Sequence, residues 1–479
     1  MKPYKILLFI ICTIAALGLL CSFFPREGVT IGPVSLEFPS IADIMGAPEE
    51  PSESPEELIE RRMEAIENAP RNEYLEYFRT DPARIYFPDD NFYMFDSLFA
   101  AFDNASEEPV KIVHYGDSQI EVDRVSFNLR ENLQERFGGI GPGIMPFRGD
   151  YFSYSARESA TLEPVRYMAY GNSKSKPGTR AYGPMCQMSR LDTSAYVTIS
   201  SIDRNESASR YFSTLSILAG RISGTLRASC LGVSKSVTAA DMEDGMAKIT
   251  FELPDSTSKV SFSLSGHADI YGIQLEGPGG ISVDNVAMRG CSGTIFTKVA
   301  ADQLRKYYSD NNVRLIILQY GGNVMPYMNT SKGISQYKTS IMKQIAYMKS
   351  LAPDADFLFI GPSDMSTNIS GKMQTYPHLP EVVDSLRAAA VESGIAFWDM
   401  FGAMGGTNSM VKWVKNQPQL AGGDYVHFTK KGADEMGNML SKALLLYYEY
   451  YKLRADERKE LKYYTDSLSN VPVLTSRAK

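Results

Sequence analysis

The sequence predicts an α/β protein in which a parallel β-sheet, covered by helices on both faces, is interrupted by an all-β insertion. The first observation is that apolar runs of strand length alternate with long amphipathic stretches on both sides of residues 151–284. The second is that residues 151–284 are rich in β-branched, alternating runs with little helical periodicity. A third observation, an uncharged apolar run close to the N-terminus, adds a membrane segment to this prediction.

The expected strands of the parallel sheet are short apolar runs, and the expected helices are the amphipathic stretches between them. In chain order, these segments are residues 109–114, 122–137, 313–320, 333–351, 356–361, 380–393 and 433–464. Strands and helices that alternate at this spacing form a parallel sheet with helices on both faces. A further helical pattern at residues 58–77 is expected to break at Pro70.

The insertion is expected to be an all-β module with the architecture of a β-sandwich. Its clearest runs, at residues 196–202, 246–253 and 259–264, are separated by clusters of Gly, Asp, Asn and Ser. Because α/β patterns lie on both sides, we expect one discontinuous α/β domain formed by residues 106–150 and 285–450. The inserted module then occupies residues 151–284.

The N-terminal run predicts a membrane segment at residues 1–24. Lys2 and Lys5 precede residues 6–24, which carry no charge, and about 20 apolar residues span a bilayer. The basic flank would hold that end in the cytoplasm, so we expect an uncleaved anchor and a periplasmic body. A cleaved signal peptide, which would release a secreted protein, and a lipoprotein processed at Cys21 are the alternatives.

Two further segments flank the α/β domain and its insertion. Residues 25–105 are interpreted as a tether followed by a helical region, because residues 47–57 combine proline, serine and acidic residues. Residues 451–479 are interpreted as the end of the last helix and a tail. No pattern in the sequence indicates the oligomeric state.

The composition argues against several classes of function. The chain of 479 residues has a formal net charge of −7, which disfavours nucleic acid as a partner. Its four histidines and five cysteines show no metal-ligand spacing, so neither a metal nor another cofactor is expected. Buried free thiols are favoured over a disulfide between Cys186 and Cys230.

The first candidate for chemistry is Ser118, in a Gly-Asp-Ser turn between the strand at 109–114 and the next helical pattern. A serine at this position is exposed at the carboxyl edge of a parallel sheet, where open α/β folds place their sites. Its N–H would lie near the start of the following helix and could meet developing negative charge. The alternative is that Asp117 or Ser118 only caps that helix.

The second candidate is the pair Asp424 and His427, three residues apart in a glycine-led loop before the last helix. A serine hydroxyl needs a base to remove its proton, and the imidazole needs a carboxylate to fix its tautomer. This loop offers both groups. Alternatively, Asp424 or Thr429 caps the helix and His427 is a core residue.

Two glycine-containing turns could supply hydrogen-bond donors to an oxyanion. Gly322 and Asn323 belong to a Gly-Gly-Asn turn that directly follows the strand at 313–320, and the Asn amide can donate N–H bonds. Gly290 lies in a glycine-containing stretch after the β module, with Gly293 as the alternative position. An ordinary turn or loop is the alternative reading of each.

Together these segments resemble the blocks of the SGNH (GDSL) hydrolase family, in the family's order along the chain. The resemblance implies a flavodoxin-like three-layer α/β/α fold and a serine esterase. The implied catalytic residues are Ser118 as nucleophile, His427 as base and Asp424 as the acid that orients it. The implied oxyanion hole consists of the N–H groups of Ser118 and Gly290 and the side chain of Asn323. Gln119 departs from the family's leucine.

Within the family, residues 114–124 and 133–143, followed by a β module, are similar to bacterial cell-wall polysaccharide O-acetylesterases. This resemblance implies an extracytoplasmic esterase that removes O-acyl groups, in particular acetyl, from peptidoglycan or another glycan. Asp117, Gln119 and Gly322 are the expected substrate contacts. The alternatives are an O-acetyltransferase that passes the acyl group to a sugar hydroxyl, and a non-catalytic, membrane-anchored glycan-binding protein.

Overall fold

The computed structural model describes residues 53–67, 74–149, 153–171, 177–202 and 207–469, with isolated short runs before residue 37. The chain divides into two compact units, Met1–Ser54 and Pro55–Lys479. In the first unit, β1 (Val29–Ile31) pairs antiparallel with β2 (Val34–Leu36).

The predicted membrane segment cannot be followed through the structure. Most of residues 6–24, including Cys21, lies outside the described residues, as do most of the tether and residues 470–479. Within the parts of the chain that are described, no helix combines the length and the apolar character needed to cross a bilayer.

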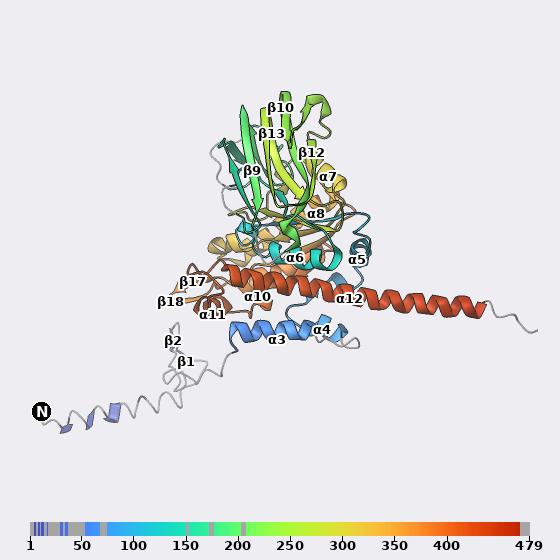
Figure 1. Ribbon diagram of the computed structural model, residues 1–479. Coiled ribbons are helices and arrows are strands. Elements are labelled where there is room, and N and C mark those ends of the chain that lie inside the picture. The colour runs from blue at the N-terminus through green and yellow to red at the C-terminus, as the bar shows by residue number, and fades with distance from the viewer. Residues whose placement is uncertain are drawn as a thin grey trace, which may run out of the picture. The chain divides into compact units, whose positions relative to one another are not determined.

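The second unit is organised around a sheet that has six strands among the described residues (Figure 1). In spatial order they are β14 (Ile281–Ala287), β4 (Val110–Gly116), β15 (Val313–Gln319), β16 (Asp356–Ile360), β19 (Ala396–Trp398) and β3 (Ile85–Tyr86). All neighbours are parallel except the edge pair, in which β3 runs antiparallel to β19.

The register brings the ends of the three strands that precede the candidate loops together. Gly116, the last residue of β4, pairs with Ala287 of β14 on one side and with Gln319 of β15 on the other. The carboxyl ends of parallel strands share one edge of the sheet. The loops after β4, β14 and β15 therefore leave the sheet side by side, although residues 151–284 separate two of them in sequence.

The described helices cover both faces of this sheet. They are α3 (Pro55–Glu67), α4 (Tyr74–Thr80), α5 (Asp96–Asp103), α6 (Ser126–Phe137), α7 (Ala301–Asp310), α8 (Ser331–Leu351), α9 (Leu379–Glu392), α10 (Met400–Ala403), α11 (Ser409–Lys415) and α12 (Lys430–Ser469). Ile112 of β4 packs in a core with Leu129 of α6 and Met439 of α12. Val113, which points the other way, packs in a second core with Ile345 of α8 and Val383 of α9. The sheet is thus the middle of three layers.

The helix expected at residues 122–137 begins later than predicted, at Ser126. A short 3-10 segment (Glu121–Asp123) comes first, and the φ values of Val122, Asp123 and Val125, which are 58°, 69° and 60°, prevent it from continuing into α6. The expectation that the N–H of Ser118 lies at the start of a helix is therefore wrong. An irregular turn separates this serine from α6.

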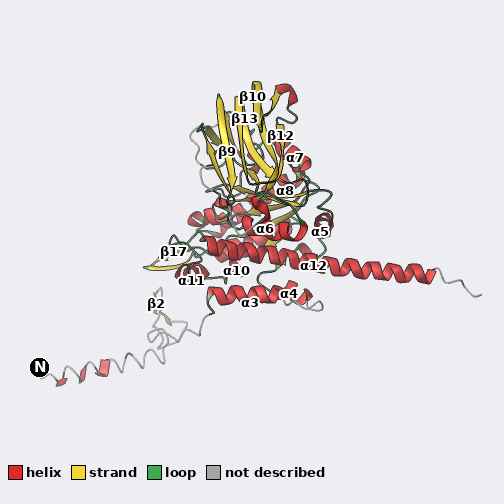
Figure 2. Ribbon diagram, viewed as in Figure 1, coloured by secondary structure: helices red, strands yellow, loops and turns green. Residues whose placement is uncertain are grey.

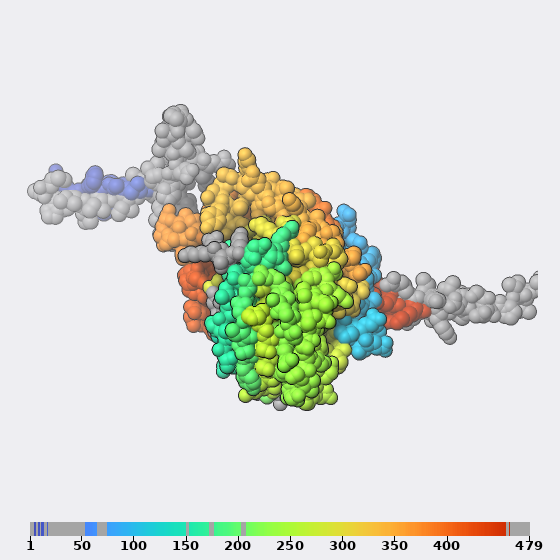
Figure 3. Space-filling model, turned by 90° about the horizontal axis from the view of Figure 1, so that it is seen from above, coloured from blue at the N-terminus to red at the C-terminus, as the bar shows by residue number. Residues whose placement is uncertain are grey.

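The β module contains a single hydrogen-bonded sheet, with nine strands among the described residues (Figure 2). They are β5 (Gly143–Met145), β6 (Ala156–Ala160), β7 (Val165–Met168), β8 (Gln187–Leu191), β9 (Ser194–Ser201), β10 (Phe212–Cys230), β11 (Val233–Thr238), β12 (Ala247–Thr257) and β13 (Lys259–Glu276). Seen from above, the green residues of β10–β13 form much of the visible face (Figure 3).

This arrangement differs from a sandwich of two separate sheets. β10 and β13 pair along most of their length, and the register shifts around Ser223 let both strands continue instead of ending. The boundaries also differ from residues 151–284. β5 already pairs with β13, whereas β14 begins at Ile281 and belongs to the parallel sheet.

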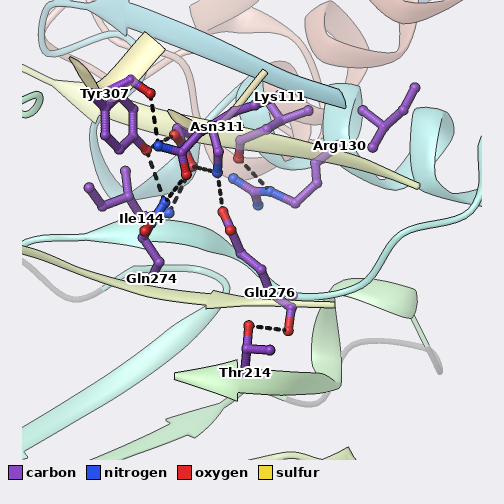
Figure 4. Close-up of polar contacts among 12 residues, drawn as sticks. Lys111, Arg130, Ile144, Thr214, Gln274, Glu276, Tyr307 and Asn311 are labelled. Atoms are coloured by element: carbon purple, nitrogen blue, oxygen red, sulfur yellow. Dashed lines mark hydrogen bonds and ion pairs between the residues drawn. The ribbon is translucent and has the colours of Figure 1, made fainter. Parts of the chain in front are cut away.

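A buried polar cluster joins the module to the parallel sheet (Figure 4). Lys111 of β4, whose side chain is 3% exposed, forms ion pairs with Glu276 of β13 and with Asp284 of β14. Tyr307 of α7 donates a hydrogen bond to Asp284, and Gln274 donates to the hydroxyl of Tyr307. Burial alone would lower the pKa of Lys111, but the two carboxylates raise it, so the ammonium group stays charged.

Candidate active site

Three side chains form a continuous chain of hydrogen bonds beside the carboxyl edge of the parallel sheet. Ser118 follows β4, and its Oγ lies 2.7 Å from Nε2 of His427. Nδ1 of His427 lies 2.7 Å from Oδ2 of Asp424. The structure therefore brings together three residues that are up to 309 positions apart in sequence. In this order the groups can pass the serine proton to the imidazole while the carboxylate holds the ring.

The loop before α12 fixes the orientation of Asp424. Its Oδ1 accepts the N–H groups of Val426 and His427, both at 3.0 Å, which leaves Oδ2 for the imidazole. Burial raises the pKa of Asp424, but the hydrogen bonds from His427 and Val426 outweigh it and lower the pKa below its ordinary value. Asp424 is therefore a carboxylate at neutral pH. The capping role falls to Thr429, whose Oγ1 accepts the N–H of Gly432.

Gln119 links the serine turn to the histidine loop. Its Nε2 donates to Ser363 Oγ at 2.9 Å and to the carbonyl of Val426 at 2.7 Å, and its Oε1 accepts the N–H of Phe428. The side chain is buried and its polar atoms are engaged within the protein. The expectation that Gln119 contacts substrate is therefore wrong, because its hydrogen bonds position His427 relative to Ser118.

Asp117 is buried as well and does not face a substrate. Its Oδ1 accepts the N–H of Gln119 at 2.9 Å, and its Oδ2 accepts a hydrogen bond from Asn323 at 2.8 Å. These bonds make a turn around Ser118 instead of the helix cap considered as the alternative. Burial, only partly offset by the Gln119 N–H, raises the pKa of Asp117 to about 6.

Asn323, at the carboxyl end of β15, lies beside this turn. Its Nδ2 donates to Asp117 and, at 3.2 Å, to the carbonyl of Cys291. A side-chain amide carries two N–H donors, so both are directed at protein acceptors. To donate to an oxyanion, Asn323 would have to share or release one of these two bonds. The bond to the Cys291 carbonyl is longer and therefore weaker, so it is the one that would be released.

The three glycines near the site differ in how much space surrounds them. Gly290 is exposed with φ of 75°, and a Cβ added there would meet nothing within 4 Å. A Cβ at Gly293 would collide with the ring of Tyr320, so this glycine is needed for packing. A Cβ at Gly322 would lie 3.8 Å from Asp117. Gly290 is thus the one of the three that leaves its backbone open to a ligand.

Several residues near the site were not assigned a role from the sequence. The guanidinium of Arg124 donates to the carbonyl of Ser118 at 3.0 Å. His114 is a core histidine, with its nitrogens 2.9 Å from Ser126 Oγ and 3.0 Å from Gln319 Oε1. Burial lowers the pKa of His114 to about 3, so it is neutral. Only the proximity of Arg124 to the serine in sequence could have indicated its contact.

The cysteines of the second unit form no disulfide. Cys186, Cys230 and Cys291 are free and buried, which agrees with the favoured expectation. Burial raises the pKa of Cys291 to about 12, so its thiol is protonated. No cluster of three or more His, Cys, Asp or Glu side chains arranged to hold a metal ion occurs in the described part of the chain.

No protein-family model matches the sequence. No curated protein sequence matches it either. The chain is similar to the solved structure of a peptidoglycan O-acetylesterase, with 21% identity and a TM-score of 0.61, over 74% of this chain and 96% of that one.

Two other solved structures share smaller similarity. A family two carbohydrate esterase from Cellvibrio japonicus has 10% identity and a TM-score of 0.25, over 62% of this chain and 99% of that one. An acetylxylan esterase from Geobacillus stearothermophilus has 17% identity and a TM-score of 0.24, over 35% and 73%. The chain therefore shares its fold with the peptidoglycan O-acetylesterase over nearly the whole length of that protein.

Proposed function

We propose that this chain is an extracytoplasmic serine esterase that removes O-acyl groups, in particular O-acetyl groups, from an envelope or extracellular polysaccharide. The observation that carries the proposal is the hydrogen-bond chain from Ser118 through His427 to Asp424, with both side-chain distances at 2.7 Å. A base within hydrogen-bond reach of a nucleophile, and itself oriented by a carboxylate, is the arrangement that acyl transfer requires.

The first step transfers the acyl group to the enzyme. Nε2 of His427 accepts the hydroxyl proton of Ser118 while Oγ attacks the ester carbonyl carbon and forms a tetrahedral intermediate. The imidazolium is stabilised by Asp424. When the intermediate collapses, the bond to the sugar oxygen breaks, and this oxygen takes the proton from His427. The sugar leaves with a free hydroxyl, and Ser118 carries the acyl group.

The second step is hydrolysis of the acyl-enzyme. His427 removes a proton from water, the hydroxide oxygen attacks the same carbonyl carbon, and Ser118 Oγ leaves with the proton from His427. In both steps the negative carbonyl oxygen would be met by the N–H groups of Ser118 and Gly290 and by Nδ2 of Asn323. Release of the Cys291 carbonyl by Asn323 would supply the last of these donors.

The polysaccharide substrate and the location are supported by separate observations. The chain shares its fold with a peptidoglycan O-acetylesterase. Tyr327 lies on the same 3-10 segment (Gly322–Tyr327) as Asn323 and is 79% exposed, so it offers an aromatic face to the C–H groups of a sugar. The location outside the cytoplasm, with residues 1–24 as a membrane anchor, is inferred from the apolar run and its basic flank.

The test is acetate release from O-acetylated peptidoglycan and from acetyl xylan by purified protein. We expect release from at least one glycan, loss of release in Ser118→Ala, and no change in Ser335→Ala, an exposed serine on α8. Equal release by Ser118→Ala and the unaltered chain would overturn the mechanism. Labelling of Ser118 by a fluorophosphonate without acetate release, together with acyl transfer to an added oligosaccharide detected by mass spectrometry, would identify a transferase instead. No labelling and no release would indicate a binding protein.

A further inference from the structure

A cavity of about 1020 Å³ lies between the β module and the loops that follow β4 and β14. On one side it is lined by Glu121, which follows Ser118 by three residues, and by Arg289, the neighbour of Gly290. On the other side it is lined by residues of β5, β6 and β7 of the module. This volume is just above the range typical of ligand pockets, roughly 300–1,000 Å³. None of Ser118, Asn323 and His427 lines the cavity, which reaches into the module from residues close in sequence to Ser118 and Gly290.

The lining is strongly charged, and most of the charges are already paired. Five arginines and four acidic residues line the cavity among the described residues. Three arginines form ion pairs with three of these acids. The pairs are Arg130 with Asp123, Arg148 with Glu163, and Arg289 with Glu121. Of the other charged lining residues, Glu158 and Arg166 have hydrogen-bond partners of their own.

Glu158 and Arg166 both contact the segment around Arg148. Both carboxylate oxygens of Glu158 accept the backbone N–H of Arg148, at 3.0 Å and 2.8 Å. Burial raises the pKa of Glu158 to about 6, so a fraction of this carboxylate is protonated close to neutral pH. The guanidinium of Arg166 donates to the carbonyl of Arg148. Among the described lining residues, arginines outnumber acidic residues by five to four, in a protein whose formal net charge is −7.

Arg157 of β6 is the cation most available to a ligand. It is exposed, lines the cavity, and has no hydrogen-bond or ion-pair partner among the residues that the structure describes. A guanidinium binds a carboxylate through two parallel N–H bonds, and such charge-assisted bonds are stronger than neutral ones.

We infer that this cavity is a subsite for a carboxylate-bearing sugar of the glycan chain, with Arg157 as the residue that meets the carboxylate. The inference rests on the proposed function, of which it narrows the substrate class to acidic polysaccharides. The acylated sugar would lie at Ser118 while an acidic neighbour on the same glycan chain occupies the cavity. The module would then contribute directly to substrate choice.

The test measures binding without turnover, using the full chain with Ser118→Ala. Titration calorimetry compares hexagalacturonate, which carries carboxylates, with neutral xylohexaose. We expect hexagalacturonate to bind at least about tenfold more tightly, and Arg157→Gln to raise its Kd about tenfold, the effect of losing charge-assisted hydrogen bonds. The same substitution should leave the Kd of xylohexaose unchanged.

The matched control is Arg227→Gln, which removes an exposed arginine of β10 that does not line the cavity. Its Kd for hexagalacturonate should equal that of the Ser118→Ala parent. Equal binding of the acidic and neutral oligomers, or an unchanged Kd in Arg157→Gln, would overturn the inference. If acetate is released from glycans but hexagalacturonate does not bind, only this inference fails. If it binds as expected and no glycan is deacetylated, the proposed esterase function fails instead.

Discussion

The parallel sheet and the β module bury their strands in different ways. All seven residues of β4 (Val110–Gly116) are buried, because helices cover both faces of the sheet. In β12 (Ala247–Thr257), buried and exposed residues largely alternate, because only one face packs in the core of the module. The difference separates two tasks. The rigid sheet positions the residues proposed for chemistry at its strand ends, and the module offers surface from which a ligand site can be built.

Removal of the imidazole should separate chemistry from folding. His427→Ala is expected to lower kcat for p-nitrophenyl acetate by about 10⁴- to 10⁶-fold, since serine then lacks its base. The melting temperature should be nearly unchanged. His378→Ala is the control, because both histidine side chains are 34% exposed and pair with an acid three residues away. Comparable kcat values for the two variants would contradict the assigned role of His427.

Removal of the buried ammonium group should weaken the joint between the two regions. Lys111→Met leaves Glu276 and Asp284 buried without their cation, and breaking such a cluster costs about 3 to 5 kcal/mol of the free energy of unfolding. Urea denaturation measures the loss. Lys372→Met, at an exposed position of β18 (Lys372–Thr375), should change stability by less than about 0.5 kcal/mol. A loss below about 1 kcal/mol at Lys111 would show that the cluster does not hold the module.

Loss of the side-chain amide at the end of β15 tests the oxyanion hole. Asn323→Ala is expected to lower kcat by about 10²- to 10³-fold with little change in KM, because the donor acts on the transition state. Asn329→Ala, an exposed position shortly after the same 3-10 segment, serves as the control. A variant that changes KM but not kcat would assign Asn323 to substrate binding.

Titration of Asp117 should produce a smaller effect. Its pKa of about 6 in the folded protein lies above the ordinary value of 3.8, so the folded state binds the proton more tightly than the unfolded state. Stability should therefore fall as pH rises from about 4 to about 6, by roughly 2 to 3 kcal/mol. Asp117→Asn keeps an oxygen to accept the Asn323 bond and should remove this dependence. Denaturation curves at pH 4 and pH 7 would show it, and an unchanged slope would refute the assignment.

The sequence predicted much of the sheet and the principal site residues because both follow local rules. The apolar runs of β4, β15 and β16 reflect burial on both faces, which composition alone reveals. Ser118 and the Asp424–His427 pair were recognised because each lies in a short motif whose chemistry is complementary to that of the other. In the structure, the hydrogen bonds from Ser118 to His427 and from His427 to Asp424 join the two motifs in one site.

Other features depend on contacts between distant segments, which residue patterns do not report. Gln119 and Asp117 flank the nucleophile and were expected to face substrate, yet their partners come from residues around 323 and 426. The start of α6 was misplaced because Val122 and Val125 favour regular backbone, and tertiary packing holds them at positive φ instead. The single sheet of the module depends on register shifts within β10 and β13.

The strands by which the β module enters and leaves the parallel sheet lie beside each other. β5, the first strand of the module, pairs with the C-terminal end of β13, where Gly143 lies opposite Leu275. The N–H of Ile144 also donates a hydrogen bond to Asp284 of β14. The 131 residues between positions 144 and 274 therefore depart and return at one point. An insertion that departs and returns at one point leaves the pairing of β4 with β14 uninterrupted. Its packing against the α/β part continues beyond that point, because Met188 and Tyr271 of the module belong to the same core as Val113 of β4. The module is therefore joined to the sheet by one narrow connection in the backbone and by a broad contact between side chains.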